Sequence, residues 1–155
     1  MGMILFFAAD KEIILDRFLA MNIPGLFAAE TNLYSHPKLR DQFPPSPTRF
    51  RYLNTGTYIG YVGYLRQLFE NISPISPSEC DQAQMITYYL AGHQDEIYLD
   101  YHCELFFPLY GLKRKHVRVS GKKVHSVLTG STPCVIHGNG NSASLYRYIF
   151  YQLFE

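Results

Sequence analysis

Tryptophan is absent from this chain of 155 residues, and no charge sign, cysteine pattern or apolar run dominates it. The 14 basic and 13 acidic residues leave a net charge of +1, which provides no general attraction to nucleic acid. No apolar run reaches the ~18–20 residues that span a bilayer. The three cysteines are widely spaced, unlike those of a disulfide framework or a zinc site. We therefore expect neither a nucleic-acid partner nor a membrane span.

The sequence also lacks the short motifs that identify several enzyme classes. It has no Walker loop, no GxGxxG, no GxSxG and no HExxH. A composition of 47% hydrophobic and 17% charged residues is typical of a globular protein, and the length suits one compact domain. The chain is rich in tyrosine, with 13 residues. Because each buried tyrosine hydroxyl needs a partner, we expect many of them to line a surface or a groove.

The pattern of apolar residues predicts alternating strands and helices, and therefore an α/β fold. Residues 4–9 and 25–30 are expected to be buried strands on either side of a helix at 11–21. This β-α-β unit predicts a parallel strand pair. The other expected elements are helices at 63–71, 79–90 (with Ser78 as N-cap) and 144–154, strands at 97–100 and 134–136, and a hairpin of 117–119 with 124–128.

The most informative corner follows the apolar strand at 134–136. His137 appears at once, and Gly138 and Gly140 bracket Asn139. An imidazole can ligate a metal or transfer a proton. The glycines tolerate positive φ and leave backbone N–H groups uncovered, so that a ligand can approach closely. We expect the functional site to include this corner.

Three further positions carry polar groups at the ends of predicted elements. Asn54 is suited either to sugar hydroxyls or to an Asx-turn. Asp81, at a helix start, is suited to act as a base or to bind a sugar, or simply to interact favourably with the helix dipole. Asp100 with His102 is suited to share a metal with His137 in a hydrolase, or to form a local hydrogen bond.

The order of these features resembles the glycosyltransferase domain of the procollagen lysyl hydroxylases, and more distantly the procollagen galactosyltransferases. The specific landmarks are the run Leu-Asn-Thr-Gly-Thr-Tyr-Ile-Gly-Tyr at 53–61 and the His-Gly-Asn-Gly at 137–140. Phe-Ala-Ala-Glu at 27–30 precedes the first of these landmarks, and the pair Asp81-Gln82 lies between the two, in the same order as in the family. The resemblance covers most of the chain.

The resemblance implies a partial GT-A-like fold, with a mixed sheet and flanking helices. Residues 1–155 would form a single domain that corresponds to the C-terminal part of such a glycosyltransferase domain. The implied activity is a manganese-dependent transfer of glucose or galactose from UDP-glucose or UDP-galactose. The implied acceptor is hydroxylysine, or galactosylhydroxylysine, of a collagen-like chain, and the implied location is the endoplasmic reticulum of the secretory pathway.

The resemblance also assigns roles to individual residues. His137 would bind Mn²⁺, and Asp81 would be the catalytic residue near the transferred sugar and the acceptor. The implied nucleotide- or sugar-binding positions are Tyr34, Asn54, Gly138, Asn139 and Gly140.

One departure from the family concerns the metal. An ungapped alignment places Ala8 and Lys11 at the two aspartates of the family's Asp-x-x-Asp motif, and Asp10 would replace one of them only after a register shift. Mn²⁺ prefers several oxygen ligands, so that His137 alone would hold it poorly. A poorly held ion removes the Lewis acid that stabilises the leaving diphosphate. We expect weak transfer or none.

Two main interpretations follow. The first is an impaired glycosyltransferase, and the second is a non-catalytic module, derived from the same fold, that binds sugar or collagen. Either version would expose a sheet edge where the family's N-terminal half packs, because this chain starts at about the strand that ends that half. An exposed edge invites self-association.

Overall fold

The structure, a computed structural model, describes residues 4–72 and 80–154. The expected N-cap Ser78 lies outside these ranges. The helices are α1 (Lys11–Ala20), α2 (Val62–Ile72), α3 (Asp81–Leu90) and α4 (Ala143–Phe154), with short 3₁₀ turns at Pro37–Gln42 and Arg114–His116. The strands are β1 (Ile4–Phe7), β2 (Gly25–Glu30), β3 (Tyr52–Gly60), β4 (Leu99–Asp100), β5 (Phe106–Pro108), β6 (Val117–Ser120), β7 (Lys123–Ser126) and β8 (Val135–Gly138). The predicted mixed α/β fold with flanking helices is confirmed.

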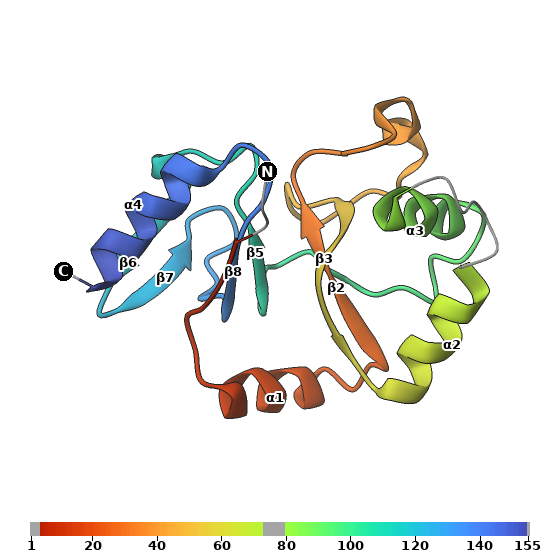
Figure 1. Cartoon of the computed structure of the whole chain (residues 1–155), viewed down its shortest axis with the longest axis horizontal. Coiled ribbons are helices and arrows are strands. Elements are labelled where there is room, and N and C mark those ends of the chain that lie inside the picture. The colour runs from red at the N-terminus through yellow and green to blue at the C-terminus, as the bar shows by residue number, and fades with distance from the viewer. Residues whose placement is uncertain (1–3, 73–79, 155) are drawn as a thin grey trace.

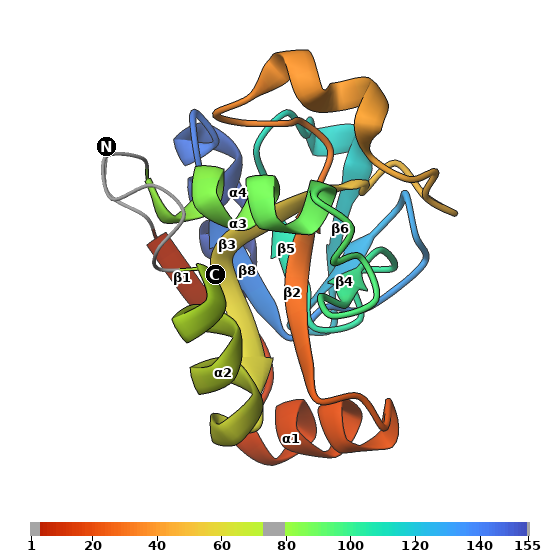
Figure 2. The ribbon, with the colours of Figure 1, turned by 90° about the vertical axis from the view of Figure 1, so that its right-hand side faces the viewer.

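The strands form two small mixed sheets and a hairpin. One sheet has the order β1-β8-β5, the other has the order β3-β2-β4, and β6 pairs with β7. Figure 1 shows α4 on the outer side of β8, α2 and α3 on the outer side of β3, and α1 across the lower end. Figure 2 shows the same arrangement from the side of α2 and α3. None of the helices in the described ranges is long and apolar enough to cross a membrane.

The predicted parallel pair of the first two strands is wrong. β1 pairs antiparallel with β8, and β2 lies in the other sheet. The parallel pairs are β2 with β4 and β5 with β8. Hydrophobic pattern identified both strands, but it does not specify partners, and β8 comes from a segment more than a hundred residues further along the chain.

The prediction that β1 is buried is also wrong. Three of its four residues are exposed, and Phe7 retains 64% of its accessible surface. The adjacent helix α1 buries Ile14 and Phe18, whereas Leu15 and Leu19 are about half exposed. The physical reason is that β1 is an edge strand, which among the described strands has β8 alone as its neighbour.

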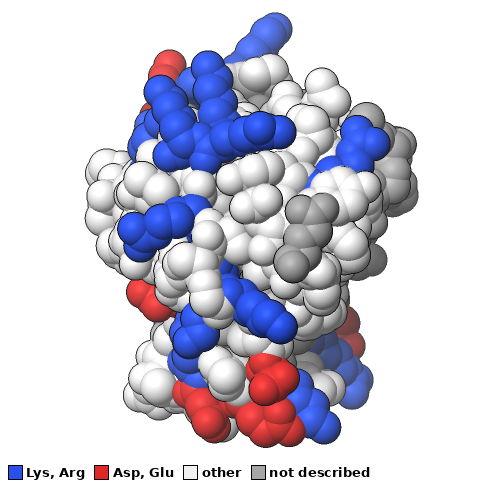
Figure 3. Space-filling model, turned by 90° about the vertical axis from the view of Figure 1, so that its left-hand side faces the viewer, with Lys and Arg blue, Asp and Glu red and all other residues white. Residues whose placement is uncertain are grey.

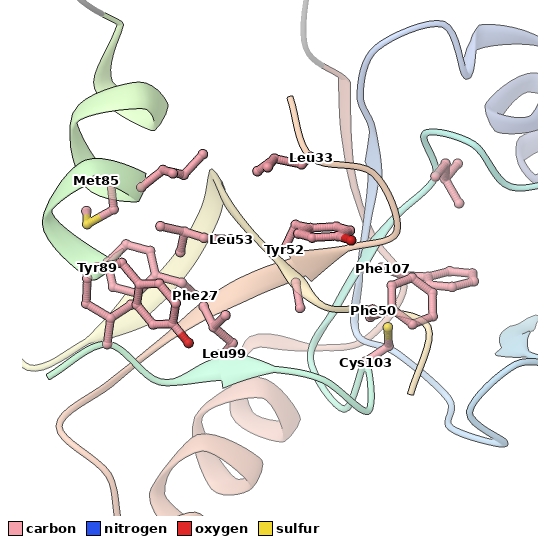
Figure 4. Packing of buried hydrophobic residues seen from close by; sticks show 14 of the residues in the cluster. Phe27, Leu33, Phe50, Tyr52, Leu53, Met85, Tyr89, Leu99, Cys103 and Phe107 are labelled. Atoms are coloured by element: carbon pink, nitrogen blue, oxygen red, sulfur yellow. The ribbon is translucent and has the colours of Figure 1, made fainter. Parts of the chain in front are cut away.

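The main core lies around β2 and β3. Figure 4 shows Phe27 and Leu53 packed against Met85 and Tyr89 of α3, with Phe107 of β5 on the other side. Burying aromatic and aliphatic side chains of this size contributes roughly 1.5–3 kcal/mol each. This core fixes the polar ends of β2, β3 and β8 relative to one another.

The predicted hairpin is confirmed at its turn. Gly121 and Lys122 have φ values of 56° and 58°, the left-handed conformations that a two-residue hairpin turn requires. The surface beside it is unevenly charged. Figure 3 shows a group of Lys and Arg at the upper end of this face, and Asp and Glu together with Lys and Arg at the lower end.

Candidate functional site

A pocket of about 630 Å³ lies where the ends of β2, β3 and β8 meet the first turn of α3. A cavity of this size suits a ligand of several hundred daltons. The residues that line it are Glu30, Tyr34, Asn54, Thr55, Gly56, Asp81, Gln82, Tyr110, His137, Asn139, Gly140 and Asn141. Polar side chains dominate the lining of this pocket.

Glu30 is the centre of the polar network. It is only 1% exposed, and its carboxyl accepts three side-chain hydrogen bonds. Asn54 Nδ2 and Gln82 Nε2 donate to Oε1 at 3.1 and 3.2 Å. Asn139 Nδ2 donates to Oε2 at 3.0 Å. Three amides from three separate elements therefore hold one carboxyl at the wall of the pocket.

Strand register brings Asn54 to Glu30. β2 is buried along its whole length and ends at Glu30, and β3 runs antiparallel to it. A register shift between Phe27 and Ala28 sets Ala28 opposite Asn54. Asn54 Oδ1 then accepts the N–H of Gly56 at 2.9 Å, while its amide nitrogen is free to donate to Glu30. The local Asx-type bond and the contact with the site therefore coexist.

A second loop brings Asn139 to the same carboxyl. β8 runs parallel to β5, and the turn after it places Asn139 Oδ1 at 2.9 Å from the N–H of Tyr110. Ser142 Oγ donates to the Asn139 carbonyl at 2.7 Å and holds the turn. Gly140 adopts a φ of 54°, and a Cβ there would lie 2.4 Å from the Tyr110 ring. Both the conformation and the space require glycine at this position.

Burial controls the ionisation of Glu30. It raises the pKa of the Glu30 carboxyl from 4.5 to about 7, although the hydrogen bonds from Asn54, Gln82 and Asn139 act in the opposite direction. Desolvation outweighs them because the carboxyl has almost no contact with water. Glu30 can therefore exchange a proton near neutral pH.

His137 lies in the same pocket but has no polar partner. It is 2% exposed, and neither ring nitrogen has a hydrogen-bond partner among the described residues. Burial lowers the pKa of the His137 imidazole from 6.5 to about 4, so that the ring is neutral at physiological pH. Buried polar atoms without partners are rare in folded proteins, which makes these nitrogens candidates for contact with a ligand.

The His137 ring packs against the backbone of Gly56. A Cβ at this position would lie 2.2 Å from His137 Cε1 and 2.9 Å from Nε2. The absence of a side chain at Gly56 therefore creates the space for the imidazole. The two sequence motifs that the resemblance singled out, at 53–61 and 137–140, are in direct contact through this pair.

Of the other expected site residues, two lie at the pocket and two do not. Tyr34, which is 64% exposed, and Asp81 lie at the pocket, and Thr55 Oγ1 lies 3.4 Å from Asp81 Oδ2. Gly138 is buried against Tyr146 of α4 and does not line the pocket. Asp10 is exposed in front of α1, beyond the end of β1 away from Gly138, so the structure does not bring it to His137.

Sequence reasoning missed the residues that organise the pocket. Glu30 was recognised only as a carboxylate that ends a strand, and Gln82 only as the neighbour of Asp81. A polar residue at the end of a fully apolar strand is the signal that was available. The convergence of the three amides was not visible, because it depends on contacts over 24, 52 and 109 residues of sequence.

The side chains at the pocket do not fit a resident manganese ion. Within residues 4–72 and 80–154 there is no group of three His, Cys, Asp or Glu side chains that could hold a metal. His137 offers a nitrogen, but the oxygens of Glu30 already accept three amide hydrogen bonds. Mn²⁺ favours several oxygen ligands, and this donor set supplies too few.

Asp100 has a structural role. Its oxygens accept the backbone N–H groups of Glu104, Leu105 and Phe106 at 2.8–2.9 Å, and it is 4% exposed. These three bonds set the turn that leads into β5. Neither Asp100 nor His102 lines the pocket of His137, so the hydrolase arrangement of these three residues is wrong.

Comparisons with known proteins agree with the resemblance read from the sequence. The family model described as PLOD GT domain matches residues 3–151. Procollagen-lysine,2-oxoglutarate 5-dioxygenase 2 of Mus musculus is 30% identical over 148 residues, which cover 92% of this chain and 20% of that protein. Procollagen-lysine,2-oxoglutarate 5-dioxygenase 1 of Gallus gallus is 28% identical over 152 residues, with the same two coverages.

A viral relative is also similar. An uncharacterized protein of Acanthamoeba polyphaga mimivirus is 28% identical over 133 residues, 86% of this chain and 28% of that protein. This chain thus spans less than a third of the length of the relatives it matches. Because the family model covers nearly the whole chain, the chain belongs to the family of PLOD GT domains, the glycosyltransferase-like domains of the procollagen lysyl hydroxylases.

Proposed function

We propose that the pocket around Glu30 and His137 binds the sugar-diphosphate part of UDP-glucose or UDP-galactose. The observation that carries the proposal is the carboxyl of Glu30, held by three amides at the wall of a pocket of about 630 Å³. A fixed carboxyl with neighbouring amides presents acceptors and donors together, which is the complement of sugar hydroxyl groups. Membership of the PLOD GT domain family supports a nucleotide sugar as the ligand.

The asparagines act mainly through Glu30. Asn54 and Asn139 each use their oxygen for a backbone N–H and their nitrogen for Glu30. They are positioning residues, which fix the carboxyl before a ligand arrives. Preorganisation of this kind improves binding because fewer groups must be ordered on association.

The exposed groups at the rim are suited to the outer parts of the ligand and to the acceptor. Tyr34 offers an aromatic face, on which a sugar or a base can stack. Asp81 lies at the start of α3, within reach of solvent. We assign Asp81 the role of the base that receives the proton of the acceptor hydroxyl, because the buried Glu30 is less accessible to a large acceptor such as a collagen-like chain.

Transfer by this chain alone should be weak. Ala8 and Lys11 stand where the family has metal-binding aspartates, and the described residues form no set that fits Mn²⁺. Binding of a nucleotide sugar without efficient transfer is the second candidate function, a module that recognises sugar or a collagen-like chain. The poor metal donor set is the observation that favours it.

Isothermal titration calorimetry with UDP-glucose and UDP-galactose, with and without Mn²⁺, tests the proposal. We expect binding in both conditions, with less than a threefold change on adding Mn²⁺, and at least a tenfold loss of affinity in His137→Ala. The substitution His102→Ala, at an exposed histidine that does not line the pocket, provides a matched control and should leave the affinity unchanged. The absence of binding to either nucleotide sugar would contradict the proposal.

A product assay separates the two candidate functions. A peptide that contains hydroxylysine or galactosylhydroxylysine is incubated with the chain and each nucleotide sugar, and the glycosylated product is measured by mass spectrometry. A slow transfer that Asp81→Asn abolishes supports the impaired enzyme. Nucleotide-sugar binding with no transfer in either protein supports the non-catalytic module.

A further inference from the structure

β1 lies at the edge of its sheet but has the sequence of an interior strand. Its four residues, Ile-Leu-Phe-Phe, are all apolar, without the alternation that marks a strand with one face in solvent. Edge strands usually carry a lysine, a proline or a bulge that prevents pairing with another chain. β1 has none of these, and its register with β8 is regular.

The exposed surface of β1 continues onto α4. Phe6 packs edge-on against Phe150 and Phe154, with ring centroids 6.4 and 5.7 Å apart. Phe7 and Phe154 each remain 64% exposed. The large exposed apolar side chains around this edge, here called the edge surface, lie on both faces of the sheet, because successive side chains of a strand alternate. They are Ile4, Phe150, Tyr151 and Phe154 on the side of α4, and Leu5 and Phe7 on the opposite face.

The size of the edge surface is close to that of an interface. Taking about 150–250 Å² for a whole aromatic side chain, the exposed parts of its six residues amount to roughly 600 Å². This area is divided between the two faces of the edge, and both faces continue across a junction of two paired strands. It approaches the ~800 Å² that each partner contributes to a typical stable interface.

The backbone of β1 shows how a partner would pair. The N–H of Ala8 donates to the Cys134 carbonyl at 2.7 Å. In an antiparallel ladder successive residues point alternately toward and away from the neighbouring strand. Phe6 and Ala8 therefore direct their polar backbone groups toward β8, whereas Leu5 and Phe7 direct theirs outward. These two residues lie symmetrically about Phe6.

We propose that two copies of this chain associate by antiparallel pairing of β1 with β1, across a two-fold axis centred on Phe6. In this register Leu5 of each copy lies opposite Phe7 of the second copy. One register satisfies all four outward-pointing backbone groups of each strand, and it places apolar side chains opposite apolar ones. A second copy is the occupant that has this symmetry by construction.

The arrangement also uses α4. The axis runs perpendicular to the sheet, so the α4 helices of both copies cover the same face of a continuous sheet. Phe150 and Phe154, which already contact Phe6, then border the junction of the two strands. No residue of β1 lines the pocket at Glu30 and His137, and because Leu5 pairs with His137 of β8, the junction lies one strand away from the pocket.

Sedimentation equilibrium of the full chain between 10 and 500 µM tests the proposal. We expect a dimer in the wild type and a monomer in Phe7→Lys, which places a charge opposite Leu5 of the second copy. Leu19→Lys, on the exposed side of α1, is the matched control and should remain dimeric. A monomeric wild type at 500 µM, or a dimer that persists in folded Phe7→Lys, would overturn the proposal.

Disulfide trapping tests the register independently of whether Phe7→Lys folds. In a Cys80→Ser background, which removes the exposed native cysteine, Leu5→Cys with Phe7→Cys should form a covalent dimer under mild oxidation. Phe7→Cys alone should form at least fivefold less, because residue 7 faces residue 5 of the second copy. Equal trapping of the double and the single variant would contradict pairing centred on Phe6.

Discussion

The two sides of the pocket differ in the hydrogen-bond partners that they give to a buried polar side chain. On one side, from β2, β3 and α3, the buried Glu30 has three amide donors from the chain itself. On the other side, from β8, the buried His137 has no polar partner for either ring nitrogen among the described residues. The carboxyl of the first side is held by the chain itself and can accept about one more hydrogen bond from a ligand, whereas the second side has its whole hydrogen-bonding capacity unused. The comparison indicates that a ligand must complete the His137 side.

The largest effect is expected where the two sides touch. In Gly56→Ala the new Cβ would lie 2.2 Å from His137 Cε1, and the ring is too deeply buried to move freely. We expect the free energy of unfolding to fall by about 3 kcal/mol, the upper range for overpacking a core. Urea denaturation measures the change.

Gly63→Ala is the control for that substitution. Gly63 lies in α2, and nothing stands within 4 Å of an added Cβ. Alanine is the better helix former, so this variant should be more stable by about 1 kcal/mol. An equal loss of stability in both variants would contradict the account of Gly56 as the space for His137.

The pH dependence of stability should distinguish the two sides by sign. Between pH 4 and 6.5 the unfolded chain protonates His137 more than the folded chain does, so that this residue makes stability fall as the pH falls. Between pH 4.5 and 7 the folded chain protonates Glu30 more, so that this residue makes stability fall as the pH rises. From pH 4.5 to 6.5 the two contributions oppose each other.

Glu30→Gln removes one of these opposing contributions. On lowering the pH from 6.5 to 4.5, the variant should lose about 2 kcal/mol more stability than the wild type does. Urea denaturation at several pH values measures this slope, which a constant effect of the substitution does not alter. A variant with the wild-type slope would show that Glu30 does not titrate in this range.

The sequence predicted the features that depend on neighbouring residues, and it failed for those that depend on contacts between residues far apart in the chain. The helix at 143–154, the hairpin turn at Gly121 and the strand that ends in Glu30 depend on local pattern, and local pattern predicted them. The pairing of β1 with β8 depends on residues far apart in the chain, and its prediction was wrong. The burial of β1 was predicted wrongly because a fully apolar strand normally has neighbours on both sides.

The candidate site shows the same division. The motif at 137–140 and the asparagine at 54 were identified from residue type and order, and both belong to the pocket. The central place of Glu30 was not predicted, because it requires the register shift in β2 and the position of Gln82 on α3. Gly138 was assigned to the ligand from its motif, but its place is against Tyr146.

A smaller effect is expected from the His137 side alone. His137→Met replaces a ring that has two unpartnered nitrogens by an apolar side chain of similar volume. We expect the free energy of unfolding to rise by about 1 kcal/mol, because no buried polar group then lacks a partner at this position. Affinity for a nucleotide sugar should fall at the same time. A variant that is both less stable and still binds would contradict the role of His137 as a ligand-facing group.

The smallest effect on stability is expected at the rim. Tyr34 is largely exposed, so Tyr34→Ala should change the free energy of unfolding by less than about 0.5 kcal/mol. Loss of the aromatic face should still weaken nucleotide-sugar binding by roughly tenfold, as expected for a stacking contact of about 1 kcal/mol or more. Calorimetry measures the affinity, and Tyr34→Phe should restore it. Equal affinities in all three proteins would remove Tyr34 from the site.

The most direct test of the account concerns Glu30 as the group that binds sugar. Calorimetric titration of UDP-glucose and UDP-galactose into wild type, Glu30→Gln and Glu12→Gln compares a buried and an exposed carboxyl by the same substitution. We predict that Glu30→Gln loses at least tenfold in affinity while Glu12→Gln matches the wild type. Wild-type affinity in a folded Glu30→Gln variant would contradict the account.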